Sequence, residues 1–317
     1  MFVSYKLDNF GKELRKIRKS LGFNQKDVQK LVGVSPDAMR KIEMGQVLPR
    51  YDTLELLSVA YKQDLLDLLK SCRVDKMLLE FHDDLDYIIT YYDKAASARL
   101  KKKLQESFPS SSLFSMINPA EFKQFIAFVD AVDDFNSDFL ADWEKTKEKL
   151  IKVLRLTLPD FNLKYFKKFT YSYIEFRILL LISLFIAKGE DYPLSNTILY
   201  HILKTIADRK YSTKYIDFLI LNIYFNIAYN YHMLDKHEKV IEAADAGIDY
   251  CLEHRTYHAL FSLYYRKGIA QFHLYDEGYK ESITTAFYIL KAVRLPELLE
   301  HFREITEKNY GIRIKLV

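Results

Sequence analysis

Apolar residues recur every three or four positions along most of the chain, which is the spacing of amphipathic helices. In the first quarter this pattern predicts five short helices, at residues 9–20, 25–32, from 36 onward, 51–61 and 64–69. A longer stretch without Pro or Gly, residues 74–105, follows. Beyond residue 113 the pattern predicts further helices over residues 119–140, 143–156, 165–188, 194–209, 213–234, 238–253, 256–275, 279–293 and 296–309. We therefore expect an all-α protein.

The residues between the second and third predicted helices favour a tight turn. Asn24 can cap the second helix together with Asp27, three positions later. Gly33 can adopt the positive φ that ends a helix, and Ser35 followed by Pro36 is a typical start of the next one. Two helices joined by so short a turn cross steeply, as they do in a helix-turn-helix motif.

Several residues in this part of the chain agree in type and spacing with the phage-repressor-type (Xre-like) DNA-binding domain. The matching residues are Arg18, Leu21, Gly22, Asn24, Gln25, Gly33, Val34, Ser35, Ile42, Glu43, Gly45 and Pro49. Residues 9 to about 70 therefore resemble that five-helix module. The resemblance implies that Arg18 pairs with Glu43 and ties the first helix to the third, and a phosphate contact by Arg18 is the alternative.

The same resemblance implies a DNA-binding surface on the second and third helices. It places Gln25 on a phosphate and the exposed face of the third helix, the recognition helix, in the major groove. Lys41 is our first candidate for reading a base, because a cation can reach the acceptors of guanine, whereas Asp37 would accept from cytosine or exclude other bases. Many relatives carry Gln or Ser near Pro36 and Asp37, so the bases that are read stay open. The expected DNA-binding residues are Gln25, Ser35, Pro36, Asp37, Arg40 and Lys41.

The positive charge of the chain lies in this same segment. The 317 residues carry a net charge of +4, and residues 1–70 hold 13 Lys and Arg against 9 Asp and Glu. The rest of the chain is neutral, so the charge favours a DNA-binding module attached to a part that does not bind DNA. Cys72 and Cys251 are the two cysteines and lack a CxxC partner, so the sequence indicates neither a disulfide scaffold nor a zinc site.

Neither a membrane anchor nor a catalytic motif is evident in the sequence. The longest apolar run, residues 178–187, is too short to span a bilayer, and the N-terminus lacks the basic start and apolar core of a signal peptide. We therefore expect a cytoplasmic protein without a membrane partner. His254 and His258 have the spacing of a metal pair, but no third ligand is evident. We accordingly expect no metal, no cofactor and no enzymatic activity.

Residues 71–112 are expected to connect two domains, residues 1–70 and 113–317. The predicted helix at residues 74–105 has apolar positions that alternate spacings of three and four, the pattern of a helix that packs on a partner helix. These positions are Leu78, Phe81, Leu85, Ile88 and Tyr92. The partner is either a second subunit or the C-terminal body of the same chain, and both alternatives stay open.

Two consecutive helix pairs in the C-terminal half share a pattern typical of tetratricopeptide repeats. The first pair carries Tyr224, Ile227, Ala228 and Tyr231, followed by Val240, Ala244 and Gly247. The second pair repeats it about forty residues later with Tyr264, Gly268, Phe272 and Ala286. Small residues such as Ala228 and Gly268 fit positions where two helices approach closely. Residues 113–309 therefore predict a tetratricopeptide-like right-handed α-superhelix with a concave inner face.

An Xre-like domain, a linker helix and such repeats together resemble the RRNPP family of peptide-pheromone receptors, in its Rgg, PlcR and PrgX branch. The resemblance implies a homodimeric transcription factor of quorum sensing that binds an operator, an inverted repeat in double-stranded DNA. It also implies that the C-terminal domain binds a short linear signalling peptide after its re-import. Repeats that bind a protein partner or a small molecule instead are the alternative.

One helix face in the repeats carries the polar groups that an extended peptide backbone requires. Asn222, Asn226 and Asn230 lie four residues apart, so their amides share a face, and each amide offers a donor and an acceptor. Ser262 and Arg266 fall beside them after the forty-residue shift, and Arg266 could bind a carboxylate. The alternative is that the three Asn side chains face water or cap neighbouring loops.

The last seven residues alternate apolar and mostly charged side chains, with Ile312, Ile314 and Leu316 on one side. Alternation of this kind predicts a short strand rather than a helix. The segment is expected to be either an arm near the peptide site or a chain end packed on the last helix.

Overall fold

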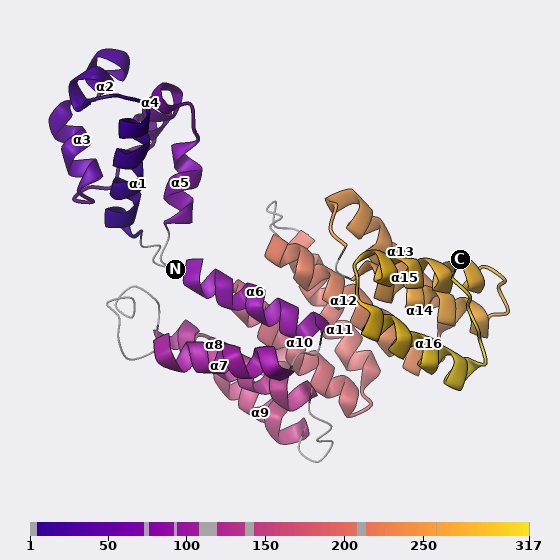
Figure 1. The fold of residues 1–317 in the computed structure, drawn as a ribbon. Helices are drawn as coiled ribbons and strands as arrows, with labels where there is room; N and C mark the ends of the chain where they lie inside the picture. The colour runs from indigo at the N-terminus through magenta and orange to yellow at the C-terminus, as the bar shows by residue number, and fades with distance from the viewer. Residues whose placement is uncertain are drawn as a thin grey trace. The chain divides into compact units, whose positions relative to one another are not determined.

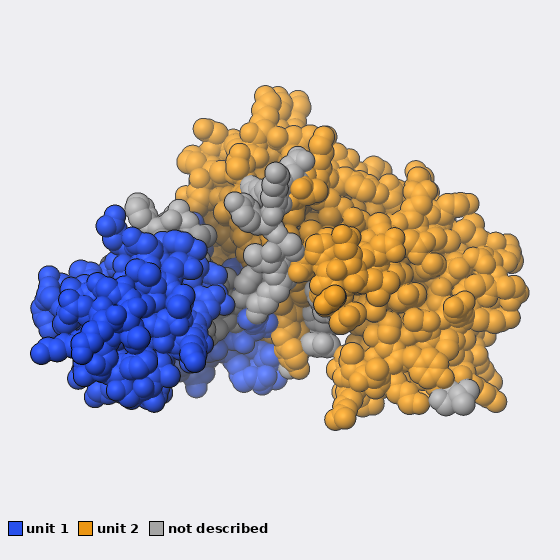
Figure 2. Space-filling view, turned by 90° about the horizontal axis from the view of Figure 1, so that it is seen from above, with its two compact units in different colours: residues 1–85, 95–122 blue, residues 86–94, 123–317 orange. Residues whose placement is uncertain are grey.

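The computed structural model describes residues 5–72, 76–91, 94–107, 119–136, 143–207, 214–257 and 259–316. The chain divides into two compact units, residues 1–85 with 95–122 and residues 86–94 with 123–317 (Figure 2). The division passes through a helix, because residues 85 and 86 fall in different units. Over the described ranges the secondary structure is helical, as the sequence predicts, and none of these helices is long and apolar enough to cross a membrane.

The first unit begins with five short helices around a common core (Figure 1). Their bounds are α1 Leu7–Ser20, α2 Gln25–Val32, α3 Pro36–Glu43, α4 Tyr51–Tyr61 and α5 Leu65–Ser71. The core contains Phe10, Leu14, Val28, Met39 and Leu57, each fully buried. These residues repeat every three or four positions on their helices, so the amphipathic pattern in the sequence directs one face of each helix inward.

The caps expected around the first turn are confirmed. The Asn24 side chain accepts from the backbone N–H groups of Lys26 and Asp27, while Asp27 accepts from the Asn24 N–H, which completes a capping box. Gly33 ends α2 at a φ of 79°, in the left-handed region. The Ser35 hydroxyl then accepts from a backbone N–H in the first turn of α3. These local bonds separate α2 from α3 and determine where each begins and ends.

The single linker helix expected over residues 74–105 is wrong, because the structure has two helices there. They are α6 Lys76–Tyr91 and α7 Lys94–Ser107. Within the first unit, Lys103 of α7 lies 3.0 Å from Asp84 of α6 and over the Phe81 ring. Two shorter helices can contact one another and bury apolar side chains that one long helix would expose. Phe81, Leu85 and Ile88 are buried within a single copy of the chain, whereas the side chains of Leu78 and Tyr92 lie outside the described residues.

The second unit is a succession of helices that pack on their neighbours (Figure 1). After α8 Pro119–Asn136, whose first turn belongs to the first unit, come α9 Trp143–Leu154, the short 3-10 helix η3 Leu163–Lys168, α10 Tyr173–Lys188, α11 Tyr192–Ala207, α12 Lys214–Met233, α13 His237–His254, α14 Leu260–His273, α15 Tyr279–Ala292 and α16 Pro296–Tyr310. Pairs α12 with α13, α13 with α14 and α14 with α15 lie side by side.

The one helix expected over residues 165–188 is also wrong, because η3 and α10 are separate elements. Phe169 between them is extended, with φ −99° and ψ 150°. Ser172 then caps α10 in a capping box with Glu175, so the helix begins at Tyr173. The apolar period continues across this break because both elements bury residues in the second unit. The period of apolar residues therefore cannot reveal where the helix is interrupted.

The small residues of the repeats lie where helices approach closely, as expected. A Cβ added to Gly268 would lie 2.6 Å from Ile283 Cγ1, and one added to Gly247 would lie 2.9 Å from Leu263 Cδ1. Ala228 is fully buried. Any larger side chain at Gly268 would push α14 away from α15, so the spacing of small residues determines how tightly these helices pack.

The strand expected at the C-terminus is wrong. Residues 311–316 form neither a strand nor a helix, and Gly311 ends α16 at a φ of 69°. Ile312 is buried, and Ile314 and Leu316 pack beside it on a cluster that includes Phe287. The alternating pattern therefore reflects one side of an extended segment that packs on helices, without strand pairing.

Candidate nucleic-acid interface and ligand pocket

The recognition helix α3 exposes one carboxylate between two cations. Asp37 Oδ1 lies 2.9 Å from Arg40 Nη2, and Asp37 Oδ2 lies 2.7 Å from Lys41 Nζ. The three side chains are about half exposed, at 58%, 50% and 46%. The hydrogen bonds from Lys41 and Arg40 lower the pKa of the Asp37 carboxyl, so it stays charged at neutral pH. In this structure the expected base reader Lys41 is therefore held by its own helix.

The other expected DNA-binding residues stand at the N-termini of α2 and α3. Ser35 is exposed and caps α3, and Pro36 is the first residue of that helix. Gln25 is the first residue of α2 and is half-buried. Its side-chain Nε2 donates to Glu43 Oε2 at 3.1 Å, which fixes the amide beside α3. The expected DNA-binding residues thus lie at the first turn of α2 and along α3, from its cap to its last turn.

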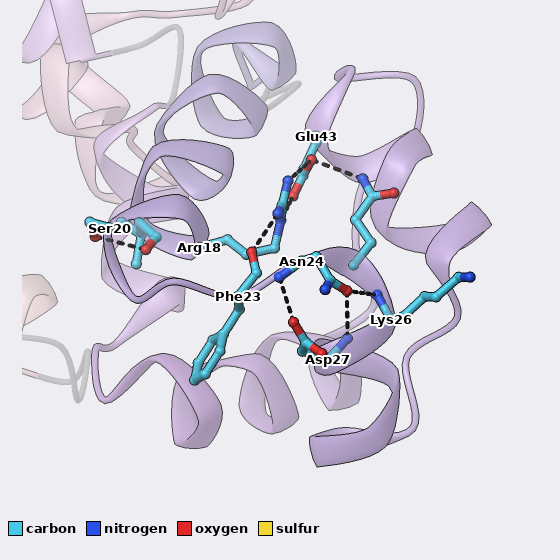
Figure 3. A network of polar contacts seen from close by, with 9 residues as sticks. Arg18, Ser20, Phe23, Asn24, Lys26, Asp27 and Glu43 are labelled. Carbon is cyan, nitrogen blue, oxygen red and sulfur yellow. Dashed lines mark hydrogen bonds and ion pairs between the residues drawn. The ribbon is translucent and has the colours of Figure 1, made fainter.

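A buried ion pair joins α1 to α3, as the resemblance implies (Figure 3). Arg18 Nε and Nη2 donate to the two oxygens of Glu43 at 2.6 and 3.0 Å, and Arg18 Nη1 donates to the Phe23 carbonyl at 2.7 Å. Arg18 and Glu43 are only 6% and 7% exposed. Burial and the nearby Glu43 carboxylate raise the pKa of Tyr61. Arg18 is therefore occupied inside the domain, which supports its structural role over a phosphate contact.

The second unit contains a largely apolar pocket with a volume of about 110 Å³. Its walls are Phe, Leu and Val side chains of α8, α10 and α12, together with Ile89 near the end of α6. The polar side chains in its lining are Arg177, Asn222 and Asn226. Two of the expected peptide-binding residues thus lie in one pocket, together with an arginine that the sequence argument missed.

Arg177 is a buried cation in the second turn of the mainly apolar helix α10. It is 3% exposed, and its Nη2 lies 2.7 Å from Asp86 Oδ1 of α6. Its guanidinium lies 5.2 Å from the Phe128 ring centroid and 5.8 Å from that of Phe218. Burial lowers the pKa of Arg177, but Asp86 and Tyr173 outweigh it and raise the pKa above its ordinary value. The one signal in the sequence was a positive charge directly before the apolar run of residues 178–187.

The three asparagines of α12 do not share one environment. The side-chain amides of Asn222 and Asn226 donate to the backbone carbonyls four residues earlier, at 2.8 and 2.7 Å, and both line the pocket. Asn230 is fully buried and donates instead to Ser195 and Asn196 of α11, at 2.9 and 2.8 Å. In this structure the amide nitrogen of Asn230 therefore joins two helices and does not face the pocket.

The two expected residues of α14 lie outside the pocket lining. Ser262 donates to the carbonyl of Ala259 in its own helix. Arg266 is half-buried and lies over two rings of α12, 5.2 Å from the Phe225 centroid and 4.9 Å from that of Tyr229. Phe225 is itself part of the pocket lining. Arg266 thus stands behind one wall of the pocket, whereas Ser262 makes only a local bond.

The histidines do not assemble into a metal site within the described ranges. His254 stacks on Tyr250 and lies near Asp217, while His258 falls outside the described residues. His237 and His273 stack with a centroid separation of 4.4 Å and an interplanar angle of 7°. No group of three ligating side chains among the described residues could hold a metal ion.

Comparisons with known proteins found one matching family model and several similar folds. Residues 14–68 match the family described as Helix-turn-helix (HTH_3). Bacillus thuringiensis PlcR, solved in complex with the peptide PapR7 and DNA, has a TM-score of 0.65 and 17% identity over 92% of this chain and 99% of PlcR. ComR from S. thermophilus, solved with DNA and its signalling peptide ComS, has a TM-score of 0.61 and 13% identity over 96% of this chain and 100% of ComR.

The Streptococcus dysgalactiae SHP pheromone receptor Rgg2 is similar to the same extent, with a TM-score of 0.59 and 15% identity over 95% of this chain and 99% of Rgg2. A search of curated proteins by sequence found no match. At such low identity the likeness concerns the fold. Residues 14–68 therefore match the helix-turn-helix family, and more than nine tenths of the chain has the fold that PlcR, ComR and Rgg2 share.

Proposed function

We propose that this protein is a sequence-specific transcriptional regulator, controlled by a short signalling peptide that binds in the pocket between α8, α10 and α12. The proposal rests on the helix-turn-helix family of residues 14–68 and on a fold shared with PlcR and ComR, which were solved with both DNA and a peptide. Because its DNA target is intracellular, the protein acts in the cytoplasm. We further propose that it acts as a homodimer.

The DNA half of the proposal depends on the exposed face of α3. Arg40 and Lys41 project from it, and the buried pair of Arg18 with Glu43 holds this helix against α1. A dimer would place two such helices in successive major grooves about one helical turn, roughly 34 Å, apart on an inverted repeat. Lys41 would read a guanine and Gln25 would contact a phosphate.

The ligand half depends on the composition of the pocket. Apolar walls suit the side chains of a peptide, while the amide oxygens of Asn222 and Asn226 and the charge of Arg177 offer polar contacts. An apolar cavity of about 150 Å³ holds one benzene molecule. A pocket of about 110 Å³ therefore accommodates one anchoring side chain and leaves the rest of the peptide on the inner face of the repeats. A pocket of this size also suits a small molecule, which is the alternative ligand.

The DNA half is tested by selecting fragments of the host genome with the purified protein at physiological salt. We expect enrichment of one inverted-repeat site, and we expect Lys41→Ala to lose about 1–3 kcal/mol of specific binding while it stays folded. Lys70→Ala is the control, because Lys70 is an exposed cation on α5 that pairs with Asp67. Uniform retention of all fragments by the wild-type protein would contradict sequence-specific reading.

The ligand half is tested by calorimetry with synthetic peptides encoded in short reading frames next to the selected site. The proposal expects one peptide to bind, and it expects Asn226→Ala to weaken that binding. Thr197→Ala is the matched control, since the exposed Thr197 donates to the Pro193 carbonyl in its own helix and lies outside the pocket lining. Binding of a small metabolite in place of every peptide would favour the alternative ligand.

A further inference from the structure

An ion pair connects an arginine in the pocket lining to helix α6. Asp86 of α6 lies 2.7 Å from the buried Arg177, whose guanidinium is part of the pocket lining. The Asp86 side chain is 14% exposed and that of Arg177 is 3% exposed. One turn beyond Asp86, Ile89 contributes an apolar group to the same wall. One face of α6 thus contributes an apolar side chain to the pocket wall and a carboxylate to the arginine in the pocket lining.

A buried guanidinium such as that of Arg177 is unfavourable without an anionic partner. The guanidinium lies among the rings of Phe128 of α8, Tyr173 of α10 and Phe218 of α12. Water is largely excluded there, because the Arg177 side chain is buried. Removing one partner of a buried ion pair is strongly unfavourable, because the remaining charge is shielded from water and has no opposite charge beside it. A neutral occupant would therefore leave Asp86 in place, whereas an anionic occupant could replace it at no comparable loss.

Asp86 also lies at the boundary between the two compact units. The first compact unit consists of residues 1–85, which contain the helix-turn-helix, and residues 95–122, while Asp86 is the first residue of the second unit. Both belong to the continuous helix α6, Lys76–Tyr91. The contact with Arg177 therefore holds the part of α6 that enters the second unit, and its release would change how that end of the helix is held.

We propose that the ligand of this pocket carries a carboxylate that replaces Asp86 at Arg177, and that this exchange releases the end of α6 from the pocket wall. The ligand is then a peptide with an apolar anchor beside an acidic side chain or its own C-terminus. The inference rests on the proposed ligand function. Linkage requires the two carboxylates to compete, so weakening one partner of Arg177 strengthens the other.

The exchange can be tested before the natural ligand is known, with a pair of probes that differ only in charge. N-acetyl-phenylalanine carries the apolar ring and a carboxylate, and N-acetyl-phenylalaninamide carries the same ring without the charge. Binding of each to the full-length protein is measured by calorimetry or by chemical-shift titration. We expect the wild-type protein to bind the carboxylate probe at least about tenfold more tightly than the amide.

Two variants distinguish replacement of Asp86 by the ligand carboxylate from binding that does not involve Arg177. Asp86→Asn keeps a hydrogen-bonding side chain beside Arg177 but removes the competing charge, so the affinity for the carboxylate probe should rise about tenfold or more and that for the amide should not change. Arg177→Met keeps a long apolar side chain and should abolish the preference for the carboxylate. A circular-dichroism melt of each variant verifies folding. If Arg177→Met is unfolded, the double variant Asp86→Asn with Arg177→Met replaces it, because that variant leaves neither charge of the pair buried alone.

The release of α6 has its own readout, hydrogen exchange of peptides from residues 76–91. A saturating carboxylate probe should accelerate their exchange in the wild-type protein, and the amide probe should not. Equal affinity of the two probes for the wild-type protein, or failure of the carboxylate probe to bind Asp86→Asn, would overturn the inference. Neither result depends on DNA or on a natural peptide, so the fragment selection and the peptide titration judge the proposed function separately.

Discussion

The buried pair of α1 and α3 offers the most direct test of what holds the helix-turn-helix together. Glu43→Ala removes the two oxygens that accept from Arg18 at 2.6 and 3.0 Å, and with them the acceptor of Gln25 at 3.1 Å. Arg18 keeps its bond to the Phe23 carbonyl but remains a charged group that is 6% exposed. Removing one partner of such a buried pair costs about 3–5 kcal/mol.

That loss is large for so small a domain. A folded unit of about 70 residues has a total unfolding free energy of roughly 4–10 kcal/mol. Glu43→Ala should therefore remove a third or more of the stability of α1 to α5. Lys41→Ala is the matched control on the same helix. Its partner Asp37 is exposed at the surface, so the lost pair is worth only about 0–1 kcal/mol.

The measurement is hydrogen exchange, followed by mass spectrometry, of peptides from residues 7–71 in the full-length chain. A loss of about 3 kcal/mol lowers amide protection about 100-fold, whereas Lys41→Ala should change it by less than about fivefold. Replacing both partners, with Arg18→Met and Glu43→Leu together, should recover part of the protection. Equal protection in the Glu43→Ala and Lys41→Ala variants would refute the reasoning.

Three further outcomes are expected. Gly268→Ala, whose new Cβ would lie 2.6 Å from Ile283 Cγ1, should destabilise the second unit by about 1–3 kcal/mol in urea unfolding, and an unchanged midpoint would contradict the close approach. Asp37→Asn should free Lys41 and increase the affinity for random DNA about threefold or more in fluorescence anisotropy at low salt, with a smaller gain on the operator, because one negative charge is removed from the surface that faces phosphates. Burial, together with the nearby Arg266, lowers the pKa of His232 to about 4, and burial lowers that of His273. The unfolded state then binds protons first, so the urea midpoint should be constant above about pH 6.5 and fall as the pH drops from there toward 4, and His232→Gln should flatten that decline.

Local interactions explain why the helix-turn-helix could be predicted in detail. Asn24, Asp27 and Ser35 make their capping bonds to groups two or three residues away, and Gly33 needs only its own positive φ. Such features depend on neighbouring residues, so their spacing in the sequence is sufficient evidence. The breaks after α6 and before α10 were missed, because the apolar period runs through both and the packing of distant helices decided where the chain turns.

The ligand pocket shows the opposite case. The regular spacing of Asn222, Asn226 and Asn230 places them along one helix, yet Asn230 is turned into the contact with α11 and bonded to Ser195 and Asn196. The ionic partner of Arg177 cannot be identified from its sequence neighbours, because the fold brings Asp86 to it from another part of the chain.

By itself, the sequence determined the helical class and the helix-turn-helix with its caps, because these depend on neighbours within one or two turns. It also determined the charge on that segment, which depends on composition alone, and the small residues at helix contacts, which a repeated spacing indicates. The tertiary structure alone decided which polar groups line the pocket and which partner each one has. A helix periodicity specifies the buried face of an element, but the element that covers this face depends on how all the intervening helices pack.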